Sequence, residues 1–278
     1  MKKIYYRNKG GIGNQLFIYG FVKAISVKHN IKFVIDNSSG FKNDFYKRKP
    51  LVNCVINDNF EEAGFFIQFL FKTYKYIPDF VLKFLNIFIL NEVSIRDQLN
   101  FDQSIILTNS TVIVEGYFQS YIYFVDIRNQ IANSAFSNFG VEERYSLFYD
   151  LILNSNSVSI HVRRLQYDNL LDVDYYISAI NYIESINPEV KFFIFSDDMT
   201  WCSENFIGEK YIQVLVENPC EIQELFLMSL CNFHVIANSS FSWWGAWLSK
   251  SSNKIVIAPK NTQIGVKNLF YLNDWKIL

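Results

Sequence analysis

The stretch Val158-Ser159-Ile160-His161-Val162-Arg163-Arg164 places two guanidinium groups directly behind a short apolar run. Apolar and polar side chains alternate in it, so we expect a β-strand that ends at Arg163. Arginine is rarely buried without a partner, and its planar fork matches carboxylate or phosphate with two parallel hydrogen bonds. Either internal acids or an anionic ligand must therefore neutralise the pair, and for the doublet alone internal ion pairs are the simpler interpretation.

From this strand onward, strand patterns alternate with helix patterns. The expected strands are residues 158–163, 190–195, 211–216, 233–237 and 254–258, and the expected helices are 174–186, 200–206, 220–231 and 242–250. Such alternation is typical of right-handed crossovers that build a parallel sheet with helices on both faces. We therefore predict an α/β fold whose ligands bind beyond the carboxyl ends of the strands.

The beginning of the chain carries a similar unit. The expected order is a strand at 3–7, a tight loop Gly10-Gly11-Ile12-Gly13, a helix at 14–28 and a strand at 31–35. A dinucleotide-binding unit starts in this way, and Asp36 stands where its fingerprint places an acid. Leu16, however, fills the position of the third small residue, so the glycines alone predict no more than a turn.

The remainder of the first half is less regular. Residues 36–62 are expected to be mostly loop, residues 111–114 a strand, and residues 145–153 a helix that closes this half. The chain therefore divides near residue 150, into 1–150 and 151–278.

Composition excludes several classes of protein. The 278 residues are 50% hydrophobic, enough for a sizeable core, and 26 Lys and Arg balance 27 Asp and Glu. A chain with this charge balance has no general attraction for nucleic acid. Its substrate is expected to be neutral, or charged at one spot only.

The most apolar region, residues 63–90, is rich in Phe but interrupted by lysines and by Pro78. It falls short of the roughly 20 uninterrupted apolar residues that a membrane span requires. We expect two helices broken at Pro78 with an aromatic stripe in the core, and peripheral membrane contact is the alternative. Residues typical of a strand begin directly after Met1-Lys2-Lys3, so we expect no signal peptide. The expected location is the cytoplasm, and the inner face of the membrane is the alternative.

Polar side chains follow three of the expected strands in the second half. These are Arg163 and Arg164, then Asp197 and Asp198, then Ser239 and Ser240 at the start of a helix. In a parallel sheet all three endings share one rim. Two guanidinium groups beside the free N–H groups of a helix start would suit a diphosphate, whereas the acids could accept hydrogen bonds from a base or sugar. Taken singly, the serines and acids are ordinary caps.

A metal site is the weaker interpretation of Asp172-Val173-Asp174, although metal-dependent sugar transferases use an Asp-x-Asp arrangement. The motif directly precedes a helical pattern, where Asp174 makes a normal N-cap. The three histidines are scattered in sequence, and no Gly-x-Ser-x-Gly nucleophile elbow occurs. We therefore expect no metal.

Four segments match one family pattern in the right order. They are Gly10-Gly11-Ile12-Gly13-Asn14-Gln15-Leu16-Phe17, Gly116-Tyr117-Phe118-Gln119-Ser120, His161-Val162-Arg163-Arg164 with Phe195-Ser196-Asp197-Asp198, and Ala237-Asn238-Ser239-Ser240-Phe241-Ser242-Trp243-Trp244-Gly245-Ala246-Trp247-Leu248. The chain thereby resembles the α-1,2-fucosyltransferases of glycosyltransferase family 11 over nearly its whole length. The resemblance implies an inverting, metal-independent galactoside α-1,2-fucosyltransferase of GT-B type. Its two Rossmann-like domains would face each other across a cleft, with 1–150 on the acceptor side and 151–278 binding GDP-fucose.

The resemblance also implies roles for single residues. Arg163 and Arg164 would hold the diphosphate, His161 and one of Asp197 or Asp198 would face the guanine, and Ser239 or Ser240 would touch phosphate. Asn14, with Gly11 and Gly13, would lie near the transferred sugar and the acceptor. GDP-fucose is then the donor substrate, with no cofactor, and the acceptor is a galactose-type hydroxyl on a cell-surface, O-antigen-like glycan precursor.

One departure from the family concerns the proton acceptor. The family continues the Arg pair with Gly-Asp-Tyr, whereas this chain has Leu165-Gln166-Tyr167, and Gln166 cannot act as a base at neutral pH. Asp168 is our choice for the catalytic base, and the other candidates are Asp172, Asp174 and Glu115. Two alternative functions stay open: a transferase of the same fold that uses another nucleotide sugar, and a nucleotide-sugar-binding protein without turnover.

Overall fold

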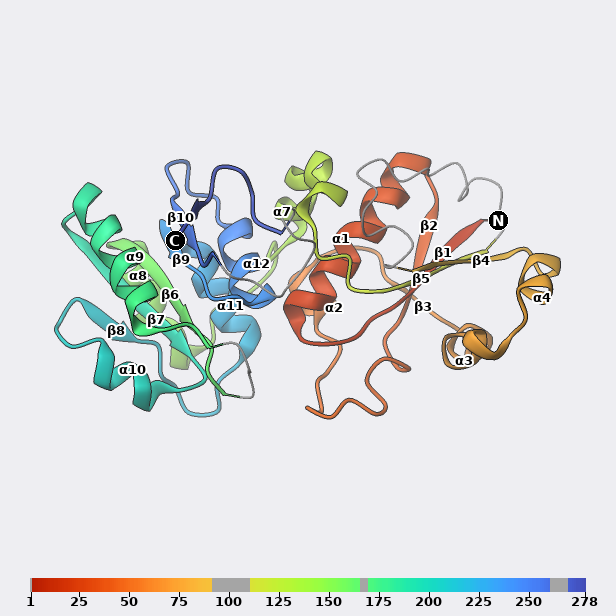
Figure 1. The fold of residues 1–278 in the computed structure, drawn as a ribbon, viewed down its shortest axis with the longest axis horizontal. Coiled ribbons are helices and arrows are strands. Elements are labelled where there is room, and N and C mark those ends of the chain that lie inside the picture. The colour runs from red at the N-terminus through yellow and green to blue at the C-terminus, as the bar shows by residue number, and fades with distance from the viewer. Residues whose placement is uncertain (1, 92–110, 166–169, 261–269) are drawn as a thin grey trace. The chain divides into compact units, whose positions relative to one another are not determined.

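A computed structural model of the chain describes residues 2–91, 111–165, 170–260 and 270–278, which form two compact units (Figure 1). Unit 1 comprises Met1–Ser137 with Gly265–Phe270, and unit 2 comprises Asn138–Ile264 with Tyr271–Leu278. Each unit contains its own parallel sheet and its own buried core. Each is therefore an α/β domain, as the alternation of patterns predicts.

The sheet of unit 1 has the strand order β3-β2-β1-β5-β4. The strand bounds are β1 Lys3–Arg7, β2 Lys32–Asp36, β3 Glu61–Glu62, β4 Ile87–Asn91 and β5 Thr111–Glu115. All pairings are parallel, and Tyr6 of β1 lies opposite both Ile35 and Val114. The predictions of strands at 3–7, 31–35 and 111–114 are confirmed to within one residue, and β4 is a strand that the sequence analysis missed.

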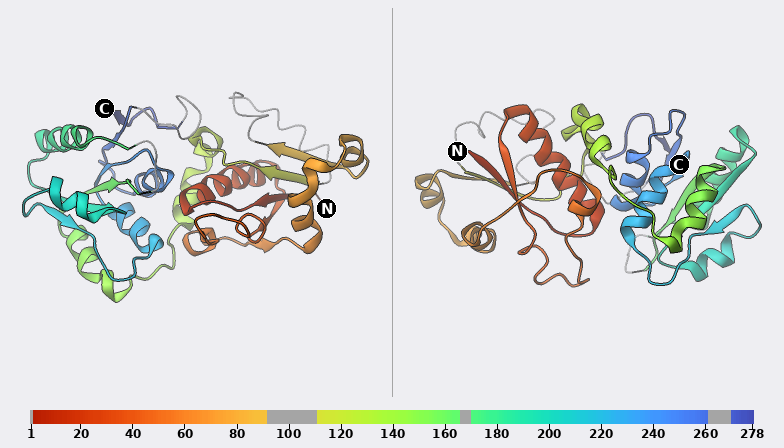
Figure 2. Two further views of the ribbon diagram at one scale, coloured as in Figure 1. Left: turned by 60° about the horizontal axis from the view of Figure 1, so that its bottom comes forward. Right: turned by 180° about the vertical axis from the view of Figure 1, so that it is seen from behind.

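The helices of unit 1 are α1 Ile12–His29, α2 Val52–Val55, α3 Phe65–Thr73, α4 Asp79–Phe84 and α7 Arg128–Ser134, with short 3-10 turns η1 Tyr74–Tyr76, η2 Tyr121–Tyr123 and η3 Val125–Ile127. α1 lies along the strands (Figure 2), and most of its residues are buried. The predicted break at Pro78 is confirmed, since this proline directly precedes α4. There its missing N–H costs no helical hydrogen bond.

The sheet of unit 2 has the order β11-β10-β9-β6-β7-β8, again with parallel pairings throughout. The strand bounds are β6 Asn156–Val162, β7 Val190–Ser196, β8 Tyr211–Gln213, β9 Phe233–Val235, β10 Val256–Ala258 and β11 Lys276–Ile277. The helices are α8 Ser146–Leu153, α9 Val173–Ile186, α10 Met199–Asn205, α11 Glu221–Leu230 and α12 Ser240–Leu248, with a 3-10 turn η4 at Glu143–Tyr145. The predicted alternation is confirmed, and β11 is an additional strand at the sheet edge.

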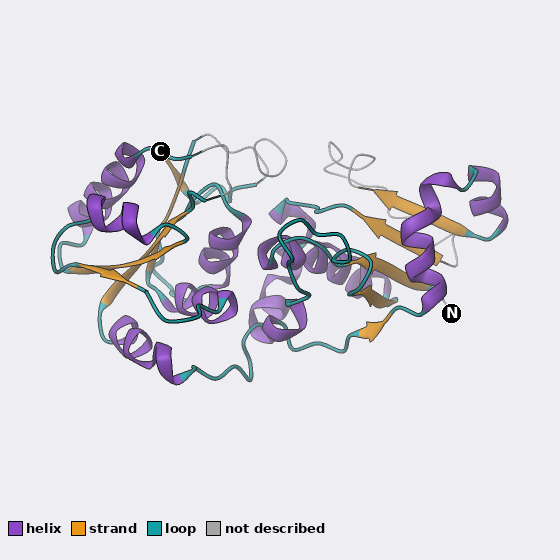
Figure 3. Ribbon diagram, turned by 90° about the horizontal axis from the view of Figure 1, so that it is seen from below, coloured by secondary structure: helices purple, strands orange, loops and turns teal. Residues whose placement is uncertain are grey.

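Helices cover both faces of the second sheet (Figure 3). On β7, Phe192 and Ile194 point into a core that contains residues of α9, whereas Phe193 and Phe195 point into a core that contains residues of α8 and α11. Alternation along a strand sends successive side chains to opposite faces, so an almost wholly apolar strand requires cover on both sides. This two-sided cover leaves the rim at the carboxyl ends of the strands for polar groups.

The helix α8 belongs to unit 2, because Ile152 packs with Phe193 and Phe195 of β7. The compact units therefore divide between Ser137 and Asn138, before the expected division at residue 150. A local sequence pattern predicts this helix at the close of the first half, because the contacts of α8 across the sheet are not visible in it.

Close packing of α11 against α12 explains the glycine in the tryptophan-rich segment. A Cβ atom added to Gly245 would lie 2.9 Å from Cβ of Met228. Trp243, Trp244 and Trp247 are all buried. The tryptophans are thus core residues of α12.

Candidate functional site

The strand order of unit 2 creates a topological switch point beside β6. From β6 the chain proceeds to β7 and β8 on one side and then returns to β9 on the other. In open parallel sheets, ligands bind at this point, beyond the carboxyl ends of the strands. His161 lies near the end of β6, which ends at Val162, one residue before the expected end, and the Arg doublet follows it; Asp197 follows β7, and Ser239 follows β9. The groups chosen from the second half of the sequence therefore share one rim of one sheet.

Asp197 holds both members of the Arg doublet. Its Oδ2 lies 2.9 Å from Nη1 of Arg163, and its Oδ1 accepts a hydrogen bond of 2.8 Å from the backbone N–H of Arg164. The parallel pairing of Val162 with Ser196 brings the two strand ends side by side, which makes this double contact possible. The contact with Arg163 is an ion pair, and together with the hydrogen bond from Arg164 it places the Asp197 carboxylate beside the Arg163 guanidinium.

Arg164 is held differently. Its Nε lies 3.7 Å from Oδ2 of Asp198, too long for a hydrogen bond, and its guanidinium carbon lies 4.3 Å from the ring centroid of Trp201. Asp198 also accepts a hydrogen bond of 3.0 Å from the N–H of Trp201 and so caps α10. The ring of Trp201 and the carboxylate of Asp198 together position the Arg164 guanidinium.

Two acids thus neutralise two arginines inside unit 2, as the simpler interpretation of the doublet predicts. The side chains are only partly buried, with Arg163 35% exposed and Asp197 19% exposed. A guanidinium carries five N–H donors, whereas the single contact with Asp197 uses one edge of it. The geometry is therefore compatible with a second anion at Arg163 while Asp197 stays in place.

His161 is the buried member of the group. Burial, and then the nearby Arg163 charge, lower its pKa to about 3, so its imidazole is neutral at physiological pH. The ring lies 5.5 Å from that of Phe241 in α12, and within the described residues its Nδ1 is buried without a hydrogen-bond partner. A neutral imidazole in this place can donate or accept one hydrogen bond but cannot deliver a proton.

The start of α12 lies at the same rim. Ser239 is its N-cap, and the Ser239 hydroxyl accepts a hydrogen bond of 3.3 Å from the N–H of Phe241. Ser240 is the first residue of the helix. The contact between Phe241 and His161 connects this helix start to the end of β6. A helix N-terminus provides backbone N–H donors and a partial positive charge, both suited to an anion.

In unit 1 the predicted glycine loop forms the start of α1. Gly10 has a φ of 77°, and an added Cβ there would come within 3.0 Å of Nδ2 of Asn14. Gly11 is the N-cap with open space around it, and Gly13 is buried in the first turn. Asn14 Oδ1 accepts a hydrogen bond of 2.8 Å from Nε2 of Gln119. Two of the family segments, residues 10–17 and 116–120, thus meet at the β1 and β5 ends.

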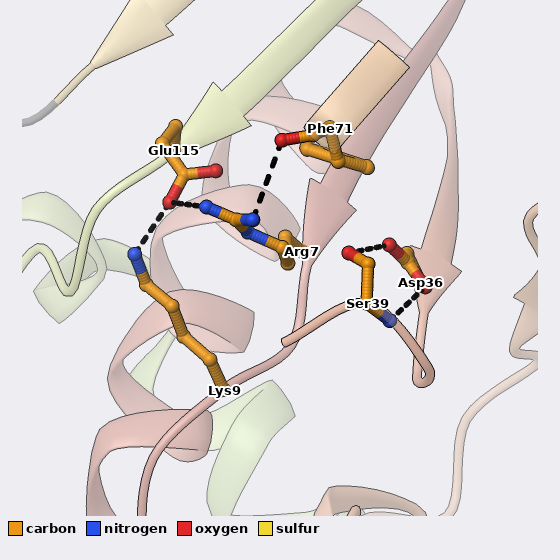
Figure 4. A network of polar contacts seen from close by, with 6 residues as sticks. All are labelled: Arg7, Lys9, Asp36, Ser39, Phe71 and Glu115. Carbon is orange, nitrogen blue, oxygen red and sulfur yellow. Dashed lines mark hydrogen bonds and ion pairs between the residues drawn. The ribbon is translucent and has the colours of Figure 1, made fainter. Parts of the chain in front are cut away.

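Figure 4 shows the charged cluster beside this loop. Glu115, at the end of β5, pairs with Arg7 at 2.7 Å and also with Lys9, and Arg7 donates a hydrogen bond of 3.3 Å to the backbone oxygen of Phe71. Asp36 accepts hydrogen bonds from the backbone N–H groups of Ser38 and Ser39, so its carboxylate closes a turn. Asp36, the acid at the position that the dinucleotide fingerprint requires, therefore has its carboxylate bound by the loop that follows it.

The catalytic base chosen from the sequence, Asp168, lies outside the described residues, as do Gln166 and Tyr167. Asp172 is the residue that precedes α9, whereas Asp174 lies in the first turn, so the predicted cap is two residues too late. In the described ranges, no group of three His, Cys, Asp or Glu side chains gathers as metal ligands would.

Glu224, near the start of α11, is an acid that the sequence analysis missed. Burial and, to a smaller extent, the neighbouring Glu221 carboxylate raise its pKa from 4.5 to about 7. A helical pattern with an acid in its first turn gives no sign of burial, since acids in first turns are ordinary. This carboxyl group loses its proton close to neutral pH.

The raised pKa of Glu224 predicts a pH-dependent stability. The folded protein holds this proton up to about pH 7 and the unfolded chain only to about 4.5, so the group destabilises the fold as pH rises between these values. We expect Glu224→Gln to stabilise the protein at pH 8 by about 1–3 kcal/mol and to change little at pH 4.5. Urea denaturation at both pH values measures this. Exposed Glu209→Gln is the control, and equal shifts at both pH values for Glu224→Gln contradict the interpretation.

Comparison with known proteins adds four findings from sequence. The family model "Glycosyl transferase family 11" matches residues 71–278. An alpha-1,2-colitosyltransferase of Escherichia coli is 31% identical over 276 residues, covering 93% of this chain and 92% of that protein. The O-antigen biosynthesis glycosyltransferase WbnK of Escherichia coli is 37% identical over 44% of each chain. A galactoside alpha-(1,2)-fucosyltransferase 2 of Oryctolagus cuniculus is 25% identical over 48% of this chain and 43% of its own length.

A solved structure shares the fold. The fucosyltransferase NodZ from Bradyrhizobium matches with a TM-score of 0.55 at 12% identity, covering 88% of this chain and 92% of that chain. At this identity the likeness concerns the arrangement of helices and strands alone. The two parallel sheets described above therefore recur in a sugar-transferring enzyme.

Proposed function

Because this chain is a member of glycosyltransferase family 11 with a GT-B-type fold, we propose that it transfers L-fucose from GDP-fucose in α-1,2 linkage to a galactose-type hydroxyl. The acceptor in this proposal is a precursor of a cell-surface, O-antigen-like glycan. The reaction inverts the anomeric carbon and uses neither metal nor cofactor.

The observation that carries the proposal is the Arg163–Asp197–Arg164 contact at the switch point of unit 2. When a sugar leaves a nucleotide diphosphate, negative charge develops on the departing phosphate. Fixed cations and helix N–H groups stabilise that charge without reorganising, and this electrostatic effect is often the largest single contribution to catalysis. Arg163, Arg164 and the start of α12 would fill this role, with Ser239 or Ser240 touching phosphate.

Neutral His161 and the acids have a separate proposed role. A guanine presents both donors and acceptors, so the Nδ1 of His161 and a carboxylate of Asp197 or Asp198 can recognise it by hydrogen bonds. On the acceptor side, Asn14 and the open space at Gly11 would lie near the transferred sugar and the acceptor, with Gly13 allowing the tight start of α1.

The identity of the transferred sugar has an alternative, because the names of the relatives include two different sugars. A relative similar over nearly the whole chain is named for colitose, whereas a more distant relative is named for fucose. The second hypothesis is therefore a transfer of colitose, or of another nucleotide-linked sugar, by the same site.

The decisive experiment is incubation of the protein with GDP-fucose, GDP-colitose and other nucleotide sugars and a panel of β-galactosides, with and without EDTA. We expect fucosyl transfer that EDTA does not reduce, with linkage analysis giving α-1,2. Transfer from GDP-colitose alone favours the second hypothesis, and tight GDP binding without any transfer favours a binding protein.

The proton acceptor in this proposal is Asp168. Its carboxylate would take the proton of the attacking hydroxyl, a contribution that is typically about 100- to 10,000-fold in rate. Asp168→Asn, assayed in the same panel, is expected to lose turnover while GDP binding persists. If that variant keeps its rate, Asp168 is not the base.

A further inference from the structure

Unit 1 carries a surface of exposed aromatic side chains on α3, η1 and α4, so the prediction that this aromatic stripe lies in the core is wrong for most of its residues. Its large apolar residues are Phe65, Phe66, Phe69, Tyr76, Phe80, Phe84 and Leu85, which we call the aromatic surface. The exposure of its aromatic side chains runs from 51% at Phe69 to 88% at Phe84. Single exposed apolar residues need no explanation, but a contiguous apolar group marks an interaction site.

The same helices are already packed on their inner side. Ile67, Leu70, Phe71 and Leu82 are buried together with residues of the sheet. Phe65 and Phe69 are four residues apart, as are Phe80 and Phe84, so each pair lies on one outer face of its helix. The aromatic surface therefore lies on the outer side of these helices, and their inner side packs in the core of unit 1.

The charged side chains around the aromatic surface indicate which kind of partner it binds. Within residues 65–85 the charged side chains are Lys72, Lys75 and Lys83 against Asp79, a net charge of 3 − 1 = +2, and all four are exposed. A second copy of the chain, joined by a two-fold axis, would bring together two surfaces of the same net positive charge. An anionic lipid surface instead attracts the lysines, while the aromatic rings enter the headgroup region.

We propose that the aromatic surface docks unit 1 on an anionic lipid bilayer. None of the helices in the described part of the chain is long and apolar enough to cross a membrane, so α3 and α4 would lie in the interface. The lysine stems would extend along the apolar surface with their ammonium groups among the lipid phosphates. This inference does not depend on which sugar the protein transfers.

The test is flotation of the full-length protein with vesicles of phosphatidylcholine alone or with 30% phosphatidylglycerol. We expect binding to the anionic vesicles and release at high salt. Lys72→Gln, Lys75→Gln and Lys83→Gln together should weaken binding about 100-fold, at roughly fivefold per lysine. Phe80→Ser with Phe84→Ser should weaken binding to anionic vesicles at least about tenfold, since these rings supply the apolar contact.

Matched controls are Leu147→Ser and Ile207→Ser, which remove exposed apolar side chains from unit 2. They should leave vesicle binding unchanged, and all variants should keep transfer to a soluble acceptor and the wild-type melting temperature. The proposal is overturned if the protein does not bind anionic vesicles, or if the lysine and phenylalanine variants bind these vesicles as strongly as the wild-type protein. Self-association that the Phe80 and Phe84 changes abolish, without lipid binding, would assign the surface to a second copy.

Discussion

Arg163→Ala should reduce the rate of sugar transfer by about 100- to 1,000-fold, the loss seen when one fixed donor to a developing negative charge is removed. Arg163 is the member of the doublet whose guanidinium Asp197 directs, at 2.9 Å. Alanine removes both the charge and the fork, so GDP binding should weaken as well. Initial rates with saturating acceptor, together with calorimetric titration of GDP, measure the two effects.

The side chain of Arg163 is 35% exposed, so the alanine variant should fold, and a melting curve checks this. Arg163→Lys keeps the charge but loses the bidentate geometry, and we expect an intermediate rate. Lys210→Ala is the matched control, because it removes a cation of the same unit that pairs with Glu184 away from the rim. Near-normal turnover in Arg163→Ala would falsify the phosphate role.

Glu115→Gln should cost about 2–4 kcal/mol of stability and lower the melting temperature by roughly 5–10 °C. Its carboxylate stands between Arg7 and Lys9, and all three side chains are largely buried. Glutamine has the same shape but no charge, which leaves two neighbouring cations without their counterion. Because removal of one partner exposes this desolvation cost, the loss exceeds that of any surface pair.

A surface pair of the same unit provides the comparison. Glu61 pairs with Lys3, and its side chain is 50% exposed, so Glu61→Gln should change stability by less than about 1 kcal/mol. Adding Lys9→Gln to Glu115→Gln should restore part of the loss, since one of the two cations is then gone. Equal melting temperatures for Glu115→Gln and Glu61→Gln would show that the buried cluster contributes no more to stability than the surface pair does.

The parallel sheet of unit 2 was predictable because its signals are local. Alternation marks β6, a short apolar run marks β7, and a period of 3.6 residues marks their helices. The rule for carboxyl ends then predicts that Arg163 and Asp197 lie at one rim. The sequence does not say which acid contacts which arginine. That depends on the register between β6 and β7, where Val162 lies opposite Ser196.

Other features depend on contacts distant in sequence, and these were missed. The short β11 at the sheet edge becomes a strand only by pairing with β10, and α8 joins unit 2 through packing on β7. The raised pKa of Glu224 likewise results from burial and from Glu221. Periodicity carries no information on such partners, so only three-dimensional structure supplies them.

The contact of Asp197 with both arginines also bears on how a reaction cycle would end. If Arg163 and Arg164 hold the phosphates of GDP while Asp198 faces the guanine, the Asp197 carboxylate lies close to those phosphates and repels them. That repulsion weakens the binding of GDP after transfer, while the cations still stabilise the departing charge. Asp197 would thus favour rapid release of the product, so that the next donor molecule meets arginines that are already in position.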